Sequence, residues 1–488
     1  MFASRLAGVL VLTLIQAFAA LALAGEADKL TFTGQVLLAD GSPVAHAVVE
    51  RQGTNQHETF PTQADGEGRF QVSDRFENGV HLHVRSADNR EQIVYQMPAP
   101  SVRVQSRTPH HIKLSPASLH KVSVLVAGQP VADAEVALTG TGFTATAKTD
   151  SAGQAEVAIP QGASLRGVAA LHSSRGVGGQ FFREGSVPQE SYVIELQPTA
   201  PHEIRVVDDD DQPVAGLEFG VHAATGNFEF ILLSPLSNTR VRTNESGIAK
   251  AAWIPRDKLR VVNPQIRSDD WKEDALDYKR MADGITVQKL RRKHPLSGRL
   301  NVPAGVDPTG ILIGGMGFGS GSRIDRVSAR ARADGTFKLM VVLDHSYILG
   351  VQDTEWACEP WTGDVRTEAD SEQAQVELAL YRATPVTVRV SRGPDHQPVA
   401  NTFVQVGTER QFKYTNEKGQ RGTALGSLWC WLMTDADGVG RAAVGHGEHK
   451  FNLSAGDWNE ERKVNIKSND SVEVDFHRAW VGKRKIVG

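Results

Sequence analysis

The feature that most constrains this chain is a sequence pattern of about 90 residues that recurs five times. Each copy contains an alternating apolar and polar strand, a turn with a proline, a second alternating strand and a later hairpin. The marker prolines are Pro43, Pro130, Pro213, Pro308 and Pro398, which are 83 to 95 residues apart. Self-similarity at a fixed period is typical of repeat architectures, so we expect a tandem array of one small unit.

The first copy shows the pattern most clearly. A strand at residues 34–38 precedes the turn at 40–45, and a hairpin follows at 64–72. The fourth copy is degenerate, because Pro308 stands there without the following valine. Strict alternation places one face of a strand inward and one outward, and Asp-Gly pairs supply the positive φ angles of tight hairpins. Short strands with such turns predict a two-sheet sandwich.

Every copy also closes on an alternating strand, and four of these strands lead into a short segment with a proline. The segments are residues 115–116, 197–198, 294–295 and 384–385. Because proline fixes φ and cannot donate to a ladder, we expect these segments to separate the strands of neighbouring domains. The predicted sandwiches are 25–116, 117–200, 201–293, 294–384 and 385–478.

One helix is predicted, near residues 271–282 within the third unit. Trp271, Ala275, Tyr278 and Met281 follow helical spacing, and the flanking Asp270 and Gly284 suit the two ends of a helix. The predicted fold class is therefore all-β: about five antiparallel sandwiches of transthyretin or immunoglobulin type, with one short helical insertion.

The N-terminus has the pattern of a secretory signal peptide over residues 1–24. Arg5 is followed by an apolar run that ends in Ala22-Leu23-Ala24, the small residues that signal peptidase requires. An uncleaved anchor helix is the alternative, because 19 residues could just cross a hydrocarbon core about 30 Å thick. We expect cleavage, no membrane span afterwards, and a secreted, periplasmic or cell-surface location.

Composition excludes several classes of protein. The net charge of −4 argues against nucleic acid as a partner. Two cysteines in 488 residues exclude a disulfide scaffold and any multi-cysteine metal site. A hydrophobic share of 40% and a charged share of 23% are ordinary for a globular protein.

The repeated residues resemble the carboxypeptidase regulatory-like family, a transthyretin-like sandwich grouped under a carbohydrate-binding-like fold. Its pattern is G-x-V, then D-G-x-P-V-x-x-A-x-V, then a T-D-x-x-G-x-F/Y hairpin. Copies one, two and five match well, as at residues 40–49 and 434–440. The resemblance implies a fold and no chemistry. In the family, such units accompany metallopeptidases, outer-membrane receptors and bacterial surface proteins as folding aids, spacers or binding modules.

No set of residues predicts a catalytic or cofactor site. His446 and His449 have neither the spacing nor the helix of a zinc peptidase motif. His81 and His83 alternate on a strand, which favours a surface pair over a metal site. The glycine-rich run 314–322 lacks a G-x-S-x-G elbow, and we expect a flexible strand edge or bulge there.

Two acidic segments could bind calcium, although simple turns are favoured. Asp208 to Asp211 are four consecutive carboxylates, and Asp435 and Asp437 resemble the opening of a calcium loop. Calcium requires six to eight oxygen ligands, and the EF-hand pattern completes them with a glutamate at position 12. Neither segment has that glutamate.

Aromatic residues offer one candidate binding site. Trp429 and Trp431 flank Cys430, so on a strand they project from the same face. Two such rings could stack on sugar rings, and the alternative is that they fill the core of the fifth sandwich.

A repeated unit with no recognisable set of catalytic residues predicts a secreted non-catalytic protein that acts in adhesion, spacing or assembly. One alternative is an array of carbohydrate-binding modules, and another is the accessory region of an exported peptidase whose catalytic domain is absent. The predicted partners are a polysaccharide or a cell-surface protein, and the oligomeric state is open. Residues 484–488 resemble the first strand of a sixth unit, so we expect the natural protein to continue past Gly488.

Overall fold

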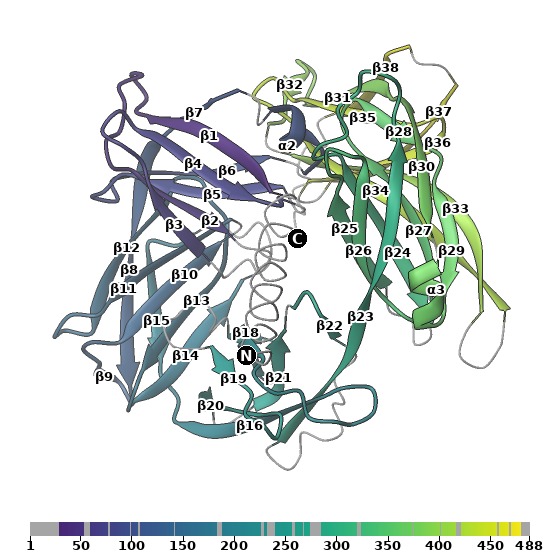
Figure 1. Ribbon diagram of the computed structural model, residues 1–488. Helices are drawn as coiled ribbons and strands as arrows, with labels where there is room; N and C mark the ends of the chain where they lie inside the picture. The colour runs from purple at the N-terminus through teal and green to yellow at the C-terminus, as the bar shows by residue number, and fades with distance from the viewer. Residues whose placement is uncertain are drawn as a thin grey trace, which may run out of the picture.

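The computed structural model describes residues 29–479 with gaps. The gaps are 53–58, 77–78, 98, 106–107, 141, 183–187, 226–228, 232–239, 256–258, 267, 274–284, 320–323, 374, 401, 416–420, 456–457 and 468–469. Figure 1 shows an all-β molecule in which the first two units and the last two units form two sides, and the third unit joins them. The predicted signal peptide at residues 1–24 lies outside the described residues.

The first two units contain the N-terminal strands and one short helix. Unit one has β1 (Leu30–Leu37), β2 (Val48–Gln52), β3 (Thr59–Gln63), β4 (Arg69–Asp74), β5 (Val80–Arg85), β6 (Glu91–Met97), helix α2 (Ala99–Gln105) and β7 (His110–Lys113). Unit two has β8 (Ser115–Val126), β9 (Gln129–Pro130), β10 (Glu135–Gly140), β11 (Phe143–Lys148), β12 (Gln154–Pro160), β13 (Leu165–His172), β14 (Gly176–Phe181) and β15 (Ser191–Glu195).

The third and fourth units share one long strand, β23 (Ile285–Asn301). Unit three begins with β16 (Thr199–Val207), β17 (Glu218–Thr225), β18 (Glu229–Ile231), β19 (Val241–Arg242), β20 (Ile248–Pro255), β21 (Leu259–Gln265) and β22 (Trp271–Glu273). Unit four continues with β24 (Leu312–Gly319), β25 (Ile324–Arg330), β26 (Thr336–Val342), β27 (His345–Gln352), β28 (Trp356–Cys358), β29 (Trp361–Val365), helix α3 (Glu368–Gln373) and β30 (Val376–Arg382).

The described residues of the fifth unit form strands and no helix. They are β31 (Thr384–Arg392), β32 (Gln397–Pro398), β33 (Phe403–Thr415), β34 (Arg421–Met433), β35 (Val439–Val444), β36 (Gly447–Ala455), β37 (Trp458–Ile466) and β38 (Val472–Arg478).

All five units repeat one sheet topology. The first strand lies between an antiparallel hairpin strand and a parallel closing strand, in the orders β4-β1-β7, β12-β8-β15, β20-β16-β23, β26-β23-β30 and β35-β31-β38. The second sheet is antiparallel, for example β11-β10-β13-β14 and β34-β33-β36-β37. The prediction of tandem all-β sandwiches is confirmed.

Buried side chains form five core clusters, one between the two sheets of each unit. The cluster of unit one contains Phe32 and Ile112, and that of unit five contains Val388 and Phe451. The cluster of unit three also includes Val177 of unit two, so these two neighbours share apolar contact. Such burial contributes about 25 cal/mol for each Å² of apolar surface removed from water.

The predicted hairpins share one backbone arrangement in all five units. In unit five, Asp435 Oδ1 accepts hydrogen bonds from the N–H groups of Asp437 and Val439 at 3.0 and 2.9 Å. Gly438 then adopts φ 69°, and its carbonyl accepts the Val390 N–H at 2.8 Å. The corresponding glycines are Gly68, Gly153, Gly247 and Gly335. Each hairpin is therefore tied to the first strand of its own unit.

The prediction that proline segments separate the strands of neighbouring units was wrong for three of the four segments, whereas residues 197–198 do lie between β15 and β16. Pro116 lies in β8, Pro295 lies in the middle of β23, and Pro385 lies in β31. In β23, His294 and Pro295 pair with Val341 and Met340 of β26. Proline lacks only the N–H donor, so a strand can continue where that donor is not needed. At these three junctions the units are consequently joined by strand, and at the remaining junction Gln197 forms an isolated bridge with Val177.

The helix predicted near residues 271–282 begins instead as a strand. Trp271 to Glu273 form β22, which pairs with Leu290 to Arg292 of β23, and residues 274–284 lie outside the described residues. Pairing with β23 gives the backbone of residues 271–273 its hydrogen-bond partners, so tertiary context overrides the predicted helix start there. The two helices that the structure describes, α2 and α3, were not predicted.

Replacing Gly438 with alanine should destabilise the fifth unit. Alanine in the left-handed region costs about 1–2 kcal/mol, and a Cβ there would also lie 2.5 Å from the Val390 carbonyl oxygen. Gly128→Ala is the matched control, because Gly128 also has a positive φ of 76° but a Cβ added to it would meet no atom within 4 Å. Calorimetry should show the larger loss of unfolding free energy for Gly438→Ala, and equal losses would contradict this account of the hairpin.

Candidate functional site

The predicted sugar-stacking residues lie on β34, next to β33. The backbone register pairs Trp429 with Gly407 and Trp431 with Gln405. These partners alternate with Val404 and Val406, which are buried in the fifth core. The side chains of Trp429 and Trp431 lie outside the described residues, so carbohydrate stacking stays a prediction.

The histidine candidates have structural partners. His83 is buried, contrary to the surface pair expected with His81, and its ring nitrogens lie 3.2 Å from Glu50 and 2.9 Å from Gln92. Unit two packs against it: the Phe143 ring lies 5.8 Å from the His83 ring, and Gln92 donates to the Ala158 carbonyl. His449 Nε2 bonds to the Gly445 carbonyl.

The acidic turn of unit three is matched by basic residues of its own closing strand. Asp208 Oδ1 accepts the N–H groups of Asp210 and Gln212. Asp211 lies 3.0 Å from Lys289 Nζ. Asp209 lies 4.0 Å from Arg291 in the same strand. Within the described part of the chain, no three His, Cys, Asp or Glu side chains are grouped to hold a metal ion.

The glycine-rich run is not a flexible edge over its described part. Residues 312–319 form β24, an inner strand between β25 and β27. The Tyr347 ring lies over Gly317, where an added Cβ would be 2.4 Å away. Tyr347 donates to buried Asp325 at 2.7 Å, and Asp325 faces Lys272 of unit three at 3.5 Å. Glycine thus makes room for the aromatic side chain that supports a contact between units.

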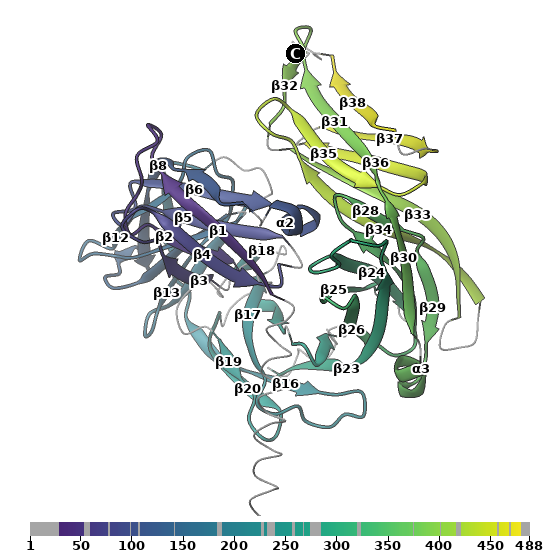
Figure 2. The ribbon, with the colours of Figure 1, turned by 45° about the horizontal axis from the view of Figure 1, so that its top comes forward.

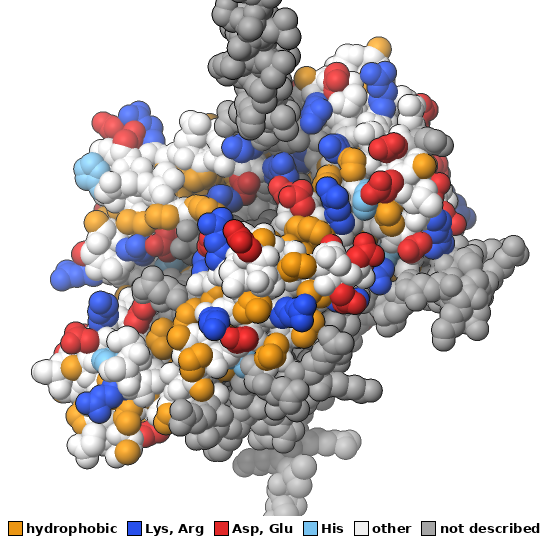
Figure 3. Space-filling model, turned by 60° about the horizontal axis from the view of Figure 1, so that its bottom comes forward, with side chains coloured by type: hydrophobic (Ala, Val, Ile, Leu, Met, Phe, Trp, Pro, Cys, Tyr) orange, Lys and Arg blue, Asp and Glu red, His pale blue; other side chains and the backbone are white. Residues whose placement is uncertain are grey.

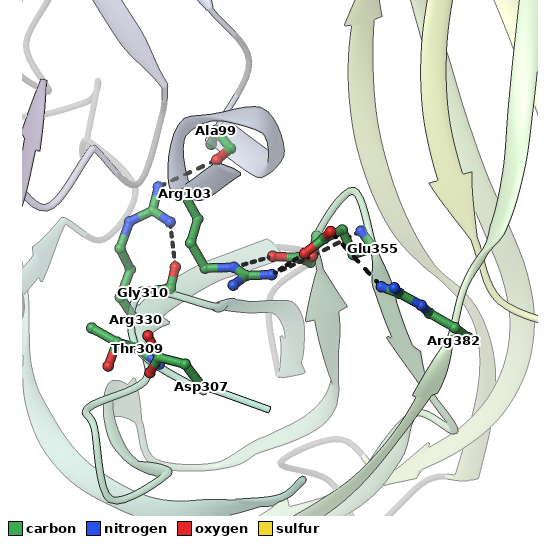
Figure 4. A network of polar contacts seen from close by, with 9 residues as sticks. Ala99, Arg103, Asp307, Thr309, Gly310, Arg330, Glu355 and Arg382 are labelled. Atoms are coloured by element: carbon green, nitrogen blue, oxygen red, sulfur yellow. Dashed lines mark hydrogen bonds and ion pairs between the residues drawn. The ribbon is translucent and has the colours of Figure 1, made fainter. Parts of the chain in front are cut away.

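The most extensive polar site joins units one and four, which are not neighbours in sequence. Arg103 of α2 donates to Asp353 Oδ2 and Oδ1 at 2.8 and 3.1 Å, and to Glu355 Oε2 at 3.0 Å. The exposed fractions of the Arg103 and Asp353 side chains are 4% and 1%. Figure 4 shows α2 presenting Arg103 toward the turn that follows β27.

A second arginine crosses the same boundary in the opposite direction. Arg330, the last residue of β25, donates to the carbonyls of Phe76 and Ala99 in unit one at 2.7 and 3.3 Å. It also donates to the Gly310 carbonyl of its own unit at 2.7 Å. Arg330 is 3% exposed. We call Arg103, Arg330, Asp353 and Glu355 with these carbonyls the ring interface.

The electrostatics of the ring interface favour the charged arginine. Burial disfavours the Arg103 charge, but hydrogen bonds and the charge of Asp353, with Glu355, outweigh it and raise the pKa of Arg103. On the solvent side, Glu355 lies 3.8 Å from Arg382, whose guanidinium stacks on Trp356 at 4.8 Å. The arrangement can hold two units together.

Contacts at the other junctions complete a closed arrangement. Unit one meets unit two through Gln92, unit two meets unit three through Val177, and unit three meets unit four through Lys272 and β23. Units one to four therefore form a ring. Figure 2 shows α2 beside the fourth unit, with the fifth unit extending beyond it. Tyr381 holds the fifth unit by accepting the His446 N–H at 3.2 Å.

Sequence reasoning missed the ring interface because its residues carry no local signal. The segment of α2 is only seven residues long, and Arg103 is one of 53 basic residues in the chain. Its helix signals are Pro100 near its start and the basic Arg103 in its last turn. On the face drawn in Figure 3, acidic and basic side chains are interleaved with hydrophobic ones.

No family model and no curated protein matches this chain. Among solved structures, the Bacillus anthracis TIE protein is 10% identical, with 83% of this chain and 71% of that chain covered and a TM-score of 0.15. The shaft pilin SpaA from Lactobacillus rhamnosus GG is 9% identical, with 38% and 97% covered and a TM-score of 0.17. A streptococcal ancillary pilin is 8% identical, with 74% and 99% covered and a TM-score of 0.13. Scores this low do not establish a shared overall arrangement.

Arg103→Ala should open the ring. Removing one partner of a buried ion pair costs about 3–5 kcal/mol because the other charge is left unpaired, and here Asp353 would lose its bidentate donor. Small-angle X-ray scattering should show a larger radius of gyration than for the wild type. Arg382→Ala is the matched control, since it removes an arginine that bonds Glu355 within unit four, and it should leave the radius unchanged. An unchanged radius for both variants would contradict the role of Arg103.

Stability should fall as the pH is lowered from about 7.5 to 5.5. Burial lowers the pKa of His202 and of His345, so both stay neutral in the folded chain. In the unfolded chain both imidazoles take up a proton below about pH 6.5. This proton uptake favours unfolding as the pH falls. Thermal melting of wild type and His202→Gln should show a weaker pH dependence in the variant. The exposed His111→Gln is the control, and a wild-type melting temperature that rises on acidification would refute the account.

Proposed function

We propose that this chain is an exported, non-catalytic scaffold protein that acts in adhesion, spacing or assembly. The observation that carries the proposal is the ring interface, where two buried arginines hold sequence-distant units in one arrangement. A scaffold needs defined distances between its ends, and flexible linkers would not supply them. The described residues also offer no metal-ligating cluster.

We also propose membership of the carboxypeptidase regulatory-like family, and domain boundaries near residues 116, 200, 293 and 384. The repeated hairpins and the five cores support these proposals. The boundary near residue 293 would then lie within β23, where the strand passes from the core of unit three to the core of unit four. Export rests on the sequence pattern of residues 1–24. Among the described residues no helix is long and apolar enough to cross a bilayer.

A carbohydrate-binding array is the second candidate, and one observation favours it. The backbone of Trp429 pairs with Gly407 and that of Trp431 with Gln405, and these two partners alternate with Val404 and Val406 of the fifth core. Sugar stacking would require both rings to be exposed.

A glycan array with the purified chain from residue 25 onward separates the two candidates. The scaffold proposal predicts no retained glycan and no hydrolysis of peptide or glycoside substrates. Carbohydrate binding would replace the scaffold proposal if the wild type retains a glycan, the double variant Trp429→Ala with Trp431→Ala does not, and the distant Trp253→Phe control still does. Turnover of any substrate would contradict both.

A further inference from the structure

A parallel ladder joins the first and the closing strand in each of the five units. The paired segments are 34–37 with 110–113, 121–125 with 191–195, 203–207 with 285–289, 298–301 with 376–379, and 386–392 with 472–478. These two strands are also the points at which the chain enters and leaves the unit. The ladder therefore lies directly between the two ends of every unit.

The relative direction of the two paired strands decides how a pulling force loads the hydrogen bonds between them. In a parallel pair, the N-terminal end of the first strand and the C-terminal end of the closing strand lie at opposite ends of the ladder. Tension along the chain then slides the two strands past each other along their axes. The inter-strand hydrogen bonds run across the strands, so the slide loads all of them together. An antiparallel terminal pair would instead open one bond at a time.

The chain between units contains almost no slack. One residue, Leu114, separates β7 from β8, one residue, Ala383, separates β30 from β31, and three residues, 196–198, separate β15 from β16. Strand β23 is 17 residues long and serves as the closing strand of unit three and the first strand of unit four. Once the ring interface between units one and four has opened, tension in one ladder therefore passes into the next, and the fifth unit, which lies outside the ring, is loaded from the start.

We propose that the array bears tensile load, and that the parallel terminal ladder of each unit is its load-bearing element. This inference rests on the proposed scaffold function. It adds that the scaffold withstands a pulling force. The first strand is further held on its other side by the antiparallel hairpin strand, as β31 is by β35. Removing β31 from the fifth unit by tension therefore requires two ladders to slide at once.

Pulling the fifth unit in two directions tests the proposal on one ladder. In the full chain, with Cys358→Ser and Cys430→Ser, the shear variant carries Pro385→Cys and Arg478→Cys as attachment points at opposite ends of the β31 and β38 pair. The unzipping variant carries Arg389→Cys and Asp475→Cys, which are directly paired and exposed. Optical tweezers then measure the rupture force of each at one loading rate.

We expect the shear variant to rupture at several times the force of the unzipping variant, because forced unfolding is governed by the barrier along the pulled direction. Equal forces, or a stronger unzipping variant, would overturn the proposal. Both variants are first compared by thermal melting. If the unzipping variant has a lower melting temperature than the shear variant, its attachment points are moved to another directly paired position, Thr387→Cys with Glu473→Cys. Glycan retention would refute the proposed function and leave this result intact, so the two failures are distinguishable.

Discussion

The continuity of strands from one unit into the next is the constraint on which the rest of this structure depends. Because β23 belongs to two sheets and single residues separate β7 from β8 and β30 from β31, each unit has little freedom to rotate against its neighbour. Strand continuity thus limits the orientations that each sandwich can take, without setting a single one. The fourth unit is brought back against the first, and the ring interface forms where they meet.

Charge at that interface has a different role from apolar burial in the cores. Moving two ions out of water costs several kcal/mol for each ion, so a buried pair contributes little net stability even with good geometry. Arg103 meets Asp353 with two hydrogen bonds, and Arg330 uses backbone carbonyls that no other orientation would offer. We infer that these groups select one arrangement of the four units, while the five apolar cores supply the stability of each unit.

The sequence predicted the repeat, the sandwich class and the glycine hairpins, because these depend on local alternation and on positive φ at residues such as Gly438. It did not predict that strands would run through Pro295, since one residue does not reveal whether a ladder needs its N–H. It also missed His83 as a buried residue and Arg103 as a contact between units, because both depend on which distant surface covers them. The Trp429 and Trp431 hypothesis lies outside what the described side chains test.

The measurement that tests the closed ring most directly is a distance between units one and four in solution. Spin labels at the exposed positions Ser73 and Thr362, in a chain with both native cysteines replaced by serine, report that distance by double electron–electron resonance. The account predicts a single narrow distribution that broadens when Arg103→Ala is added. A broad distribution in the parent chain, unchanged by Arg103→Ala, would contradict the ring.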